Sequence, residues 1–348
     1  MKIVASAPTK VVVSGEHAVV YGAPALALPI ERRNRVILQT SPGAGVYFVN
    51  KLYPQWYWSW KPGGEWVGVP IYRGFYEEVK HILAEQGRSL EKLGLALEAN
   101  VYFSFSPKGT GNSASIGAAW AHVLYAMLGV KPNQKQLFQA VQAGETSAHG
   151  NPSGIDACTV LSGSAQIFQK HWLADGKTVF NFKERHLELP RGTSLFLVET
   201  PAPEVYVATS ELVACFSQTM VGKKPTEVTP EERKQIIAPF EPITREIIHE
   251  FHLSGSPYKL GELFLQNHEL LRKGGVVPES LQKVVDLCMA EGALGAKGTG
   301  SCGPGGAVLV LCHTAKQHHL FKALKREGLS AITMPPAERG AGVESREG

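Results

Sequence analysis

Two stretches of this sequence combine residue types and spacings that could do chemistry. In SPKGTGNSAS, at residues 106–115, glycines stand just before a run of apolar residues with helical spacing. A glycine-rich loop that feeds a helix offers converging backbone N–H groups and a positive helix end to a phosphate. In the second stretch, HGNPSGID at residues 149–156, Gly, Pro and Ser separate Glu145 from Asp156, and a plain loop would not need that composition. A tight strand-to-helix turn without a ligand would also explain the glycines of the first stretch.

Other candidate motifs fail on spacing or context. No Lys-Ser or Lys-Thr pair follows the glycines of residues 106–115, so this loop is not a Walker A motif. Residues 298–306 contain a G-x-G-x-x-G, but a helical pattern precedes it and a strand pattern follows, the reverse of a dinucleotide-binding fingerprint. We therefore interpret 298–306 as a tight turn beside a ligand. The histidines of 249–252 lack the spacing of a zinc helix, and no G-x-S-x-G elbow occurs.

The elements that must position these stretches are both helical and extended. Apolar periodicity predicts short strands at 2–5 and 11–14, a hairpin within 55–70, a helix at 72–86, a strand at 95–105, a helix at 116–127, and a second helix from Pro132 that carries Glu145 near its end. A new strand near residue 190 predicts two domains, of residues 1–190 and 191–348. Downstream, Thr229 and Glu232 predict a helix start with a capping box, and a helix, a glycine-rich turn and a buried strand follow over 278–312.

Composition restricts the class of protein. The 348 residues are 44% hydrophobic, enough for a large packed core. The net charge of +4 comes from lysines and arginines spread along the chain, which suits an anionic small ligand as well as nucleic acid. Five cysteines without a C-x-x-C pair indicate a reducing compartment. Since Gly22, Pro24 and Pro29 interrupt the longest apolar stretch, it falls short of the ~18 residues of a membrane span, and we expect a cytoplasmic, soluble protein.

Three segments resemble, in order and spacing, the motifs of the GHMP small-molecule kinases. They are APTKVVVSGEHAVVYGAPALAL at 7–28, SPKGTGNSASIGAA at 106–119 and AKGTGSCGPGGAVLVL at 296–311. The resemblance spans nearly the whole chain, and GEHAVVYG and HGNPSGID are most similar to the branch that phosphorylates mevalonate. The resemblance implies an α+β GHMP kinase fold, with a ribosomal protein S5 domain 2-like N-terminal domain and a ferredoxin-like C-terminal domain.

The resemblance also implies roles for individual residues. Asp156 is expected to be the catalytic base that faces the acceptor hydroxyl, and Lys10 the cation beside it. Glu145 is expected to bind magnesium together with Ser115, which aligns with the second serine of the family loop. That loop commonly reads G-L-G-S-S-A-A, and the differences here leave the choice between Ser113 and Ser115 open.

Further residues are expected to bind the two substrates. The acceptor is expected at Glu16, His17, His149 and Thr209. The nucleotide is expected at the loop formed by Lys108, Gly109, Thr110, Gly111, Asn112, Ser113, Ala114 and Ser115.

The reaction implied by the resemblance is transfer of the ATP γ-phosphoryl group, with Mg²⁺, to the 5-hydroxyl of (R)-mevalonate in isoprenoid precursor biosynthesis. No nucleic-acid or membrane partner is expected, and the family often forms homodimers. One alternative is another acceptor, such as phosphomevalonate, mevalonate at its 3-hydroxyl, or a sugar. The other is a non-catalytic binding protein on the same fold.

Overall fold

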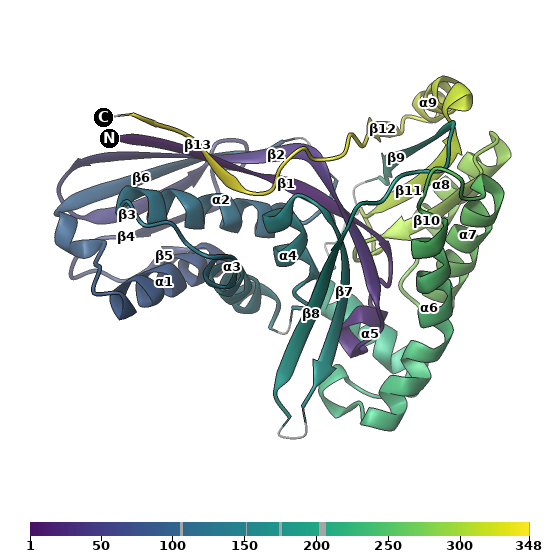
Figure 1. The fold of residues 1–348 in the computed structure, drawn as a ribbon, viewed down its shortest axis with the longest axis horizontal. Helices are drawn as coiled ribbons and strands as arrows, with labels where there is room; N and C mark the ends of the chain where they lie inside the picture. The colour runs from purple at the N-terminus through teal and green to yellow at the C-terminus, as the bar shows by residue number, and fades with distance from the viewer. Residues whose placement is uncertain (105–106, 151, 174–175, 202–206, 348) are drawn as a thin grey trace.

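Two lobes lie side by side in the computed structural model, which describes residues 1–104, 107–150, 152–173, 176–201 and 207–347 (Figure 1). Within these residues the first lobe contains a nine-stranded sheet and the second a four-stranded sheet. The first sheet consists of β1 (Lys2–Ser14), β2 (Ala25–Pro42), β3 (Gly45–Asn50), β4 (Tyr57–Trp60), β5 (Val67–Gly68), β6 (Leu95–Tyr102), β7 (Ala165–Trp172), β8 (Thr178–Arg185) and β13 (Gly342–Glu347).

The N-terminal strand is longer than its sequence pattern indicates. The two short strands predicted at 2–5 and 11–14 are one strand, β1, which pairs antiparallel with β2. The register shifts between Pro8 and Thr9, where the proline cannot donate a ladder hydrogen bond. Burial explains why alternation was weak here: nearly every side chain of β1 is buried, so both faces need apolar or small residues.

Four helices cover one face of the first sheet: α1 (Pro70–Glu85), α2 (Asn112–Met127), α3 (Gln134–His149) and α4 (Ile155–Ser162). Helices α2 and α4 pack against β1 and β2, and α1 and α3 form an outer layer (Figure 1). The buried ring of Phe75 on α1 fixes this packing, because a Cβ at Gly117 or Gly144 would come within 2.5 or 2.0 Å of the ring. Helix α2 is the helix predicted at 116–127, and it begins four residues earlier than predicted, at Asn112.

The second sheet has the strand order β10-β11-β9-β12, from β9 (Thr193–Glu199), β10 (Gly295–Thr299), β11 (Ala307–His313) and β12 (Ser330–Thr333). In chain order this is 4-1-3-2 read from β12, the arrangement of a ferredoxin-like fold. Alternate side chains face opposite ways: Phe196 and Val198 join one core cluster, and Leu195 and Leu197 another. The accompanying helices are α5 (Thr209–Val221), α6 (Pro230–Glu250), α7 (Pro257–Lys273), α8 (Glu279–Ala290) and α9 (Gln317–Arg326).

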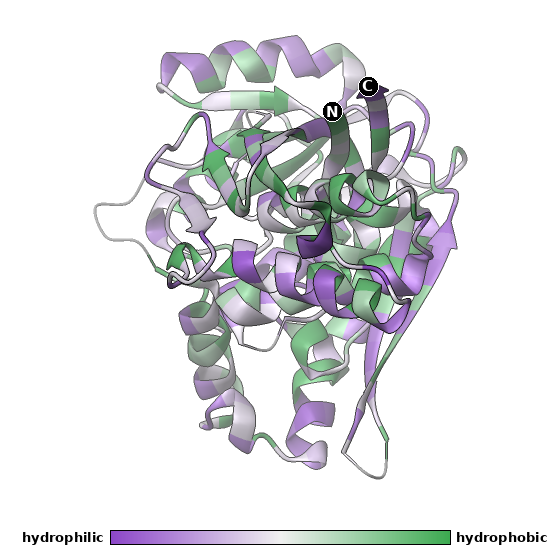
Figure 2. Ribbon diagram, turned by 90° about the vertical axis from the view of Figure 1, so that its left-hand side faces the viewer, coloured by the Kyte–Doolittle hydropathy of each residue, from purple (hydrophilic) through white to green (hydrophobic). Residues whose placement is uncertain are grey.

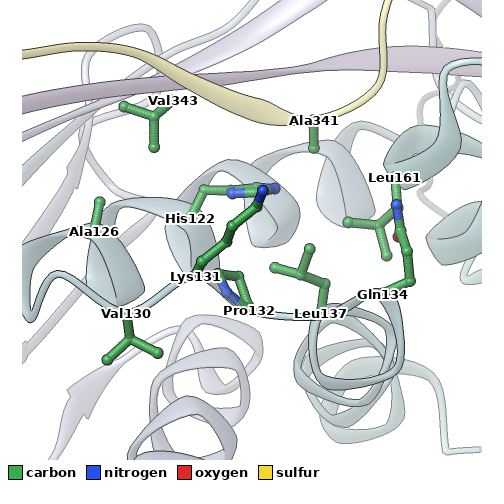
Figure 3. A pocket seen from close by; sticks show the side chains of 10 residues that line it. All are labelled: His122, Ala126, Val130, Lys131, Pro132, Gln134, Leu137, Leu161, Ala341 and Val343. Atoms are coloured by element: carbon green, nitrogen blue, oxygen red, sulfur yellow. The ribbon is translucent and has the colours of Figure 1, made fainter.

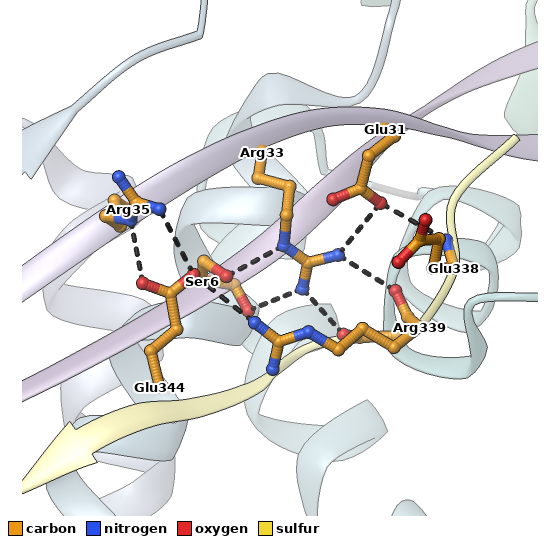
Figure 4. Close-up of polar contacts among 8 residues, drawn as sticks. Ser6, Glu31, Arg33, Arg35, Glu338, Arg339 and Glu344 are labelled. Carbon is orange, nitrogen blue, oxygen red and sulfur yellow. Dashed lines mark hydrogen bonds and ion pairs between the residues drawn. The ribbon is translucent and has the colours of Figure 1, made fainter. Parts of the chain in front are cut away.

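The C-terminal segment returns to the first lobe. Its last strand, β13, pairs antiparallel with β1, so the two chain ends lie side by side (Figure 1). The guanidinium of Arg33 fastens the segment, since it donates to the carbonyls of Arg339 and Gly340 at 2.9 and 2.8 Å and to Ser6 Oγ at 2.8 Å (Figure 4). The domain border near residue 190 stays a prediction, and residues 342–347 lie in the first sheet although the predicted second domain included them.

Several local predictions can be compared with the helices directly. Helix α6 begins after Thr229, whose hydroxyl accepts from the Glu232 N–H while the Glu232 carboxylate accepts from the Thr229 N–H, so the predicted capping box is present.

In Figure 2 hydrophobic residues gather where helices meet the sheets. Across the described ranges, every helix is too short or too polar to cross a bilayer.

Candidate active site

A lysine and a carboxylate from opposite ends of the first lobe's sequence form an ion pair. Lys10 lies on β1, and its Nζ is 3.1 Å from Oδ1 of Asp156 in the first turn of α4. The Lys10 side chain is 3% exposed and that of Asp156 is 32% exposed, so the carboxylate is the member that reaches open space. The positive end of α4 also favours a carboxylate at Asp156.

The first glycine loop lies directly against this pair. Lys10 Nζ donates to the Gly109 carbonyl at 3.0 Å, and the Lys10 backbone N–H donates to the Thr110 carbonyl at 2.9 Å. Gly111 is the N-cap of α2 with φ of 70°, and a Cβ there would lie 3.0 Å from the Lys10 side chain and 3.5 Å from Asp156 Oδ2. The loop therefore needs glycine at Gly111, and it brings the N-terminus of α2 to the ion pair.

The second acidic residue of the site is Glu145, near the end of α3. Its carboxyl is hydrogen-bonded to the Ser113 hydroxyl. Burial, and next the charge of Asp156, raise the pKa of Glu145 to about 7, while Ser113 and Lys10 act in the opposite direction. Two carboxylates therefore share one region, as HGNPSGID suggested, and a cation bound there would favour the charged form of Glu145.

The expected metal ligand Ser115 is turned away from this region. It is fully buried, and its hydroxyl donates to the Ala7 carbonyl at 2.8 Å. The prediction for Ser115 therefore does not fit this structure. Helix α2 begins at Asn112, and the serine that interacts with Glu145 is Ser113, two residues before Ser115. Ala114, expected in the nucleotide loop, is also fully buried in the core of the first lobe.

The remaining loop residues hold the loop's shape. Lys108 Nζ donates to the Val207 carbonyl at 2.9 Å, which ties the loop to the segment before α5. Thr110 is buried and its hydroxyl donates to the Pro107 carbonyl at 2.6 Å. Asn112 is the first residue of α2, and its side-chain oxygen accepts from Asn34 Nδ2 at 3.1 Å.

Glu16 forms a buried ion pair that sequence reasoning missed. Its carboxylate accepts from Nζ of Lys297 on β10, and both side chains are 0% exposed. Burial raises the pKa of Glu16, and Lys297 is the largest opposing influence. The prediction that Glu16 contacts the acceptor does not fit a carboxylate enclosed in this way. A lysine within a buried-strand pattern, in AKGTG, was the signal that could have revealed Lys297.

His17 and the third glycine loop connect the two lobes. His17 is buried with φ of 54°, its Nε2 lies 3.1 Å from the Ser301 carbonyl oxygen, and its ring stacks on Phe216 at 5.3 Å between centroids. Burial lowers the pKa of His17 to about 4, so the ring is neutral at physiological pH. The two glycine loops meet, because a Cβ on Gly300 would lie 2.7 Å from the Gly109 carbonyl oxygen. All three motifs thus converge on one region.

Two other expected acceptor residues lie at the border of this region. His149 ends α3, and its Nε2 is 3.6 Å from Glu145 Oε2. Burial lowers the pKa of His149, while the charge of Asp156 acts to raise it. Thr209 is the first residue of α5, whose Leu212 side chain packs against Gly303 of the third loop.

The carboxylate and hydroxyl groups of the site suit a magnesium ion that takes few protein ligands. Among the described residues no group of three or more His, Cys, Asp and Glu side chains could hold a metal ion by itself. Glu145 Oε1 is nevertheless buried with no hydrogen-bond partner among them, and the Ser113 hydroxyl lies beside the same carboxyl. One carboxylate and one hydroxyl suit Mg²⁺, which takes few protein ligands and completes its shell with phosphate oxygens and water.

The geometry of the site agrees with two family models. The GHMP kinases N terminal domain matches residues 77–164, and the GHMP kinases C terminal model matches residues 247–329. The first match contains the loop, Glu145 and Asp156, and the second contains Lys297. The chain thus carries regions that match both the N-terminal and the C-terminal domain of the GHMP kinases.

Mevalonate kinases are among the curated relatives of this chain. The enzyme of Aeropyrum pernix is 27% identical over 341 residues, which cover 98% of each chain. The enzyme of Pyrococcus furiosus is 26% identical over 371 residues and 99% of each chain.

Solved structures of several members share the fold. L. major mevalonate kinase in complex with R-mevalonate matches with a TM-score of 0.71 at 21% identity, over 97% of this chain and 96% of that one. Lactococcus lactis galactokinase complexed with galactose matches with a TM-score of 0.74 at 16% identity, over 98% and 94%. Because the scores are so similar, the fold alone does not select an acceptor.

Proposed function

We propose that this chain transfers the γ-phosphoryl group of ATP to the 5-hydroxyl of (R)-mevalonate. The observation that carries the proposal is the ion pair of Lys10 and Asp156 beside the glycine loop, in a chain whose full-length curated relatives are mevalonate kinases. The lysine supplies a positive charge and the partly exposed carboxylate a proton acceptor, the two groups that transfer to an alcohol uses.

The proposed step uses the chain's own groups as follows. The acceptor oxygen forms a bond to the γ-phosphorus as the bond from that phosphorus to the bridging oxygen of ADP breaks, and the hydroxyl proton passes to the Asp156 carboxylate. General base assistance of this kind is typically worth about 10² to 10⁴ in rate. Lys10 holds the Asp156 carboxylate in position through their ion pair, and its ammonium stabilises the negative charge that develops on the oxygens.

Magnesium would bind at Glu145 with Ser113 as the second protein ligand. When bound, the ion neutralises charge on the phosphates so that an alcohol can approach. The support is the buried Glu145 oxygen that lacks a partner among the described residues. Backbone N–H groups at the start of α2 would hold phosphate oxygens nearby.

The adenine ring of ATP has a candidate stacking surface beside the loop. Tyr53, Trp56 and Phe103 form an aromatic cluster with centroid distances of 4.8 Å for Tyr53 to Trp56 and 5.8 Å for Tyr53 to Phe103. Tyr53 and Trp56 are 43% and 46% exposed. Phe103 directly follows β6, the strand that leads into the glycine loop. Base stacking on aromatic side chains is worth about 1–3 kcal/mol per base.

The acceptor is tested with a panel of alcohols and coupled detection of ADP. We expect (R)-mevalonate to have the highest kcat/KM, compared with phosphomevalonate, galactose and homoserine. Strong turnover of another alcohol without turnover of mevalonate would replace the acceptor and keep the kinase. ATP binding without turnover of any acceptor would favour the non-catalytic alternative.

The cellular setting is part of the same proposal. All five cysteines are free thiols and four of them are buried, which is consistent with a reducing compartment such as the cytoplasm. A homodimer stays a prediction, to be measured by light scattering.

A further inference from the structure

A hollow of about 380 Å³ lies in the first lobe between α2, α3, α4 and the C-terminal segment (Figure 3). Helix α2 contributes His122 and Ala126 from its second half, α3 contributes Leu137 from its first turn, and α4 contributes Leu161 near its end. The candidate active site uses the opposite ends of these three helices. Because a helix rises about 1.5 Å per residue, the distance along α2 from Ser113 to Ala126 is roughly 20 Å. The hollow is therefore separate from that site.

The hollow is lined mainly by apolar side chains. Ala126, Leu137, Leu161, Ala341 and Val343 give it apolar walls, and none of the lining residues within the described ranges is acidic. The volume falls in the range of small-molecule sites, about 300–1,000 Å³. An apolar body would therefore find contacts on several sides.

Two nitrogen-bearing side chains reach the same side of the hollow. The Lys131 side chain points toward the ring of His122 (Figure 3). His122 Nε2 is buried and has no hydrogen-bond partner among the described residues, and burial lowers the pKa of His122 to about 4. A neutral imidazole in the tautomer with hydrogen on Nε2 can donate one hydrogen bond. An ammonium group and one such N–H complement an anionic oxygen.

We propose that this hollow binds a small amphipathic anion, whose carboxylate or phosphate head meets Lys131 and His122 and whose aliphatic tail lies among the apolar walls. The ligand would touch all three helices that carry Ser113, Glu145 and Asp156. Its binding does not depend on the proposed kinase reaction, since no residue of the hollow belongs to that site.

The test is isothermal titration of the full chain with octanoate, without ATP or mevalonate. The neutral 1-octanol and the cationic octylammonium have the same tail length and serve as ligand controls. We expect one octanoate site, weaker binding of 1-octanol and no binding of octylammonium. Lys131→Met, at an exposed position where folding should be unaffected, should weaken octanoate binding about fivefold and leave 1-octanol unchanged. The matched variant Lys135→Met removes an exposed lysine outside the hollow and should change neither.

A second variant fills the space. Ala126→Phe should abolish binding of both octanoate and 1-octanol, with a thermal melt to establish that the variant is folded. Octanoate binding that survives both Lys131→Met and Ala126→Phe, or that a non-hydrolysable ATP analogue displaces competitively, would overturn the proposal. Absence of octanoate binding to the wild type would also overturn it, and the proposed kinase function would be unaffected.

Discussion

At the scale of single residues, Glu145 occupies a position where its charge is unfavourable until a cation arrives. Its carboxyl is buried and close to Asp156, and both effects raise its pKa to about 7. Such a buried carboxylate lowers the stability of the free protein, as is common for groups in binding sites, and it favours binding of a cation. Two proposals depend on the position of Glu145: that magnesium binds here, and that Ser113 is the second protein ligand.

This placement predicts a pH-dependent stability. A carboxyl whose folded pKa lies above its ordinary value of 4.5 binds more protons in the folded state, so its contribution to stability is complete below that value and lost as pH rises through about 7. Without nucleotide and metal, the free energy of unfolding of Glu145→Gln relative to wild type should therefore be higher at pH 8 than at pH 5, by on the order of 2 kcal/mol. Urea unfolding at the two pH values measures this difference. The exposed Glu184→Gln should show none, and equal pH dependence of Glu145→Gln and wild type would contradict the assigned pKa.

At the scale of elements, the contact between two glycine loops holds the nucleotide region together. Gly300 and Gly129 have nearly the same φ, 65° and 66°, but a Cβ would meet Gly109 at the first position and nothing within 4 Å at the second. Both alanine variants carry the cost of a left-handed conformation, about 1 kcal/mol. Only Gly300→Ala forces the loops apart.

We therefore expect Gly300→Ala to lower kcat/KM for ATP by at least about tenfold, since small misplacements of a phosphate-binding loop are costly. Gly129→Ala should stay near wild type in kcat/KM and lose a similar amount of stability from backbone strain. Steady-state kinetics and thermal melts separate the two effects. Equal kcat/KM values for the two variants would show that the loop contact has no role in nucleotide use.

Element boundaries also explain which site residues could be predicted from sequence. The resemblance singled out Lys10 and Asp156 because each belongs to a short motif, and the structure brings the two side chains within 3.1 Å; their catalytic roles stay predictions. The choice between Ser113 and Ser115 could not be made, since it depends on where α2 begins. Apolar periodicity starts only at Ile116, whereas the helix starts at Asn112 after a left-handed Gly111. Within a helix, Ser113 and Ser115 lie two positions and therefore about 200° apart, so their side chains point to opposite faces.

At the scale of the whole molecule, the buried pair of Glu16 and Lys297 links the turn after β1 to β10 in the other sheet. Such a pair contributes little net stability when intact, but removal of one partner leaves an uncompensated buried charge. Lys297→Met should therefore lose about 3–5 kcal/mol in urea unfolding. The double variant with Glu16→Gln should recover part of this loss, and the exposed Lys322→Met should lose little. A Lys297→Met protein as stable as wild type would mean that the pair does not hold the lobes together.

The long-range features were beyond the reach of sequence patterns. Glu16 and Lys297 are 281 positions apart, and no local periodicity connects them. The return of β13 to pair with β1 was missed for the same reason, because a six-residue strand with mostly exposed side chains has no apolar alternation. The fold class, in contrast, was predicted because three motifs of the chain resemble those of the GHMP kinases, and that resemblance implies the family fold.

We propose that the pair of Lys10 and Asp156 assists phosphoryl transfer from ATP to mevalonate. The most direct measurement is ³¹P NMR of the protein with ATP, Mg²⁺ and (R)-mevalonate, in wild type and Asp156→Asn, with nucleotide binding measured in both. The wild type should form one phosphomonoester per ADP, and Asp156→Asn should bind ATP but form product about 10² to 10⁴ times more slowly. Equal rates for the two proteins, or ADP without a phosphorylated mevalonate, would contradict this role of Asp156.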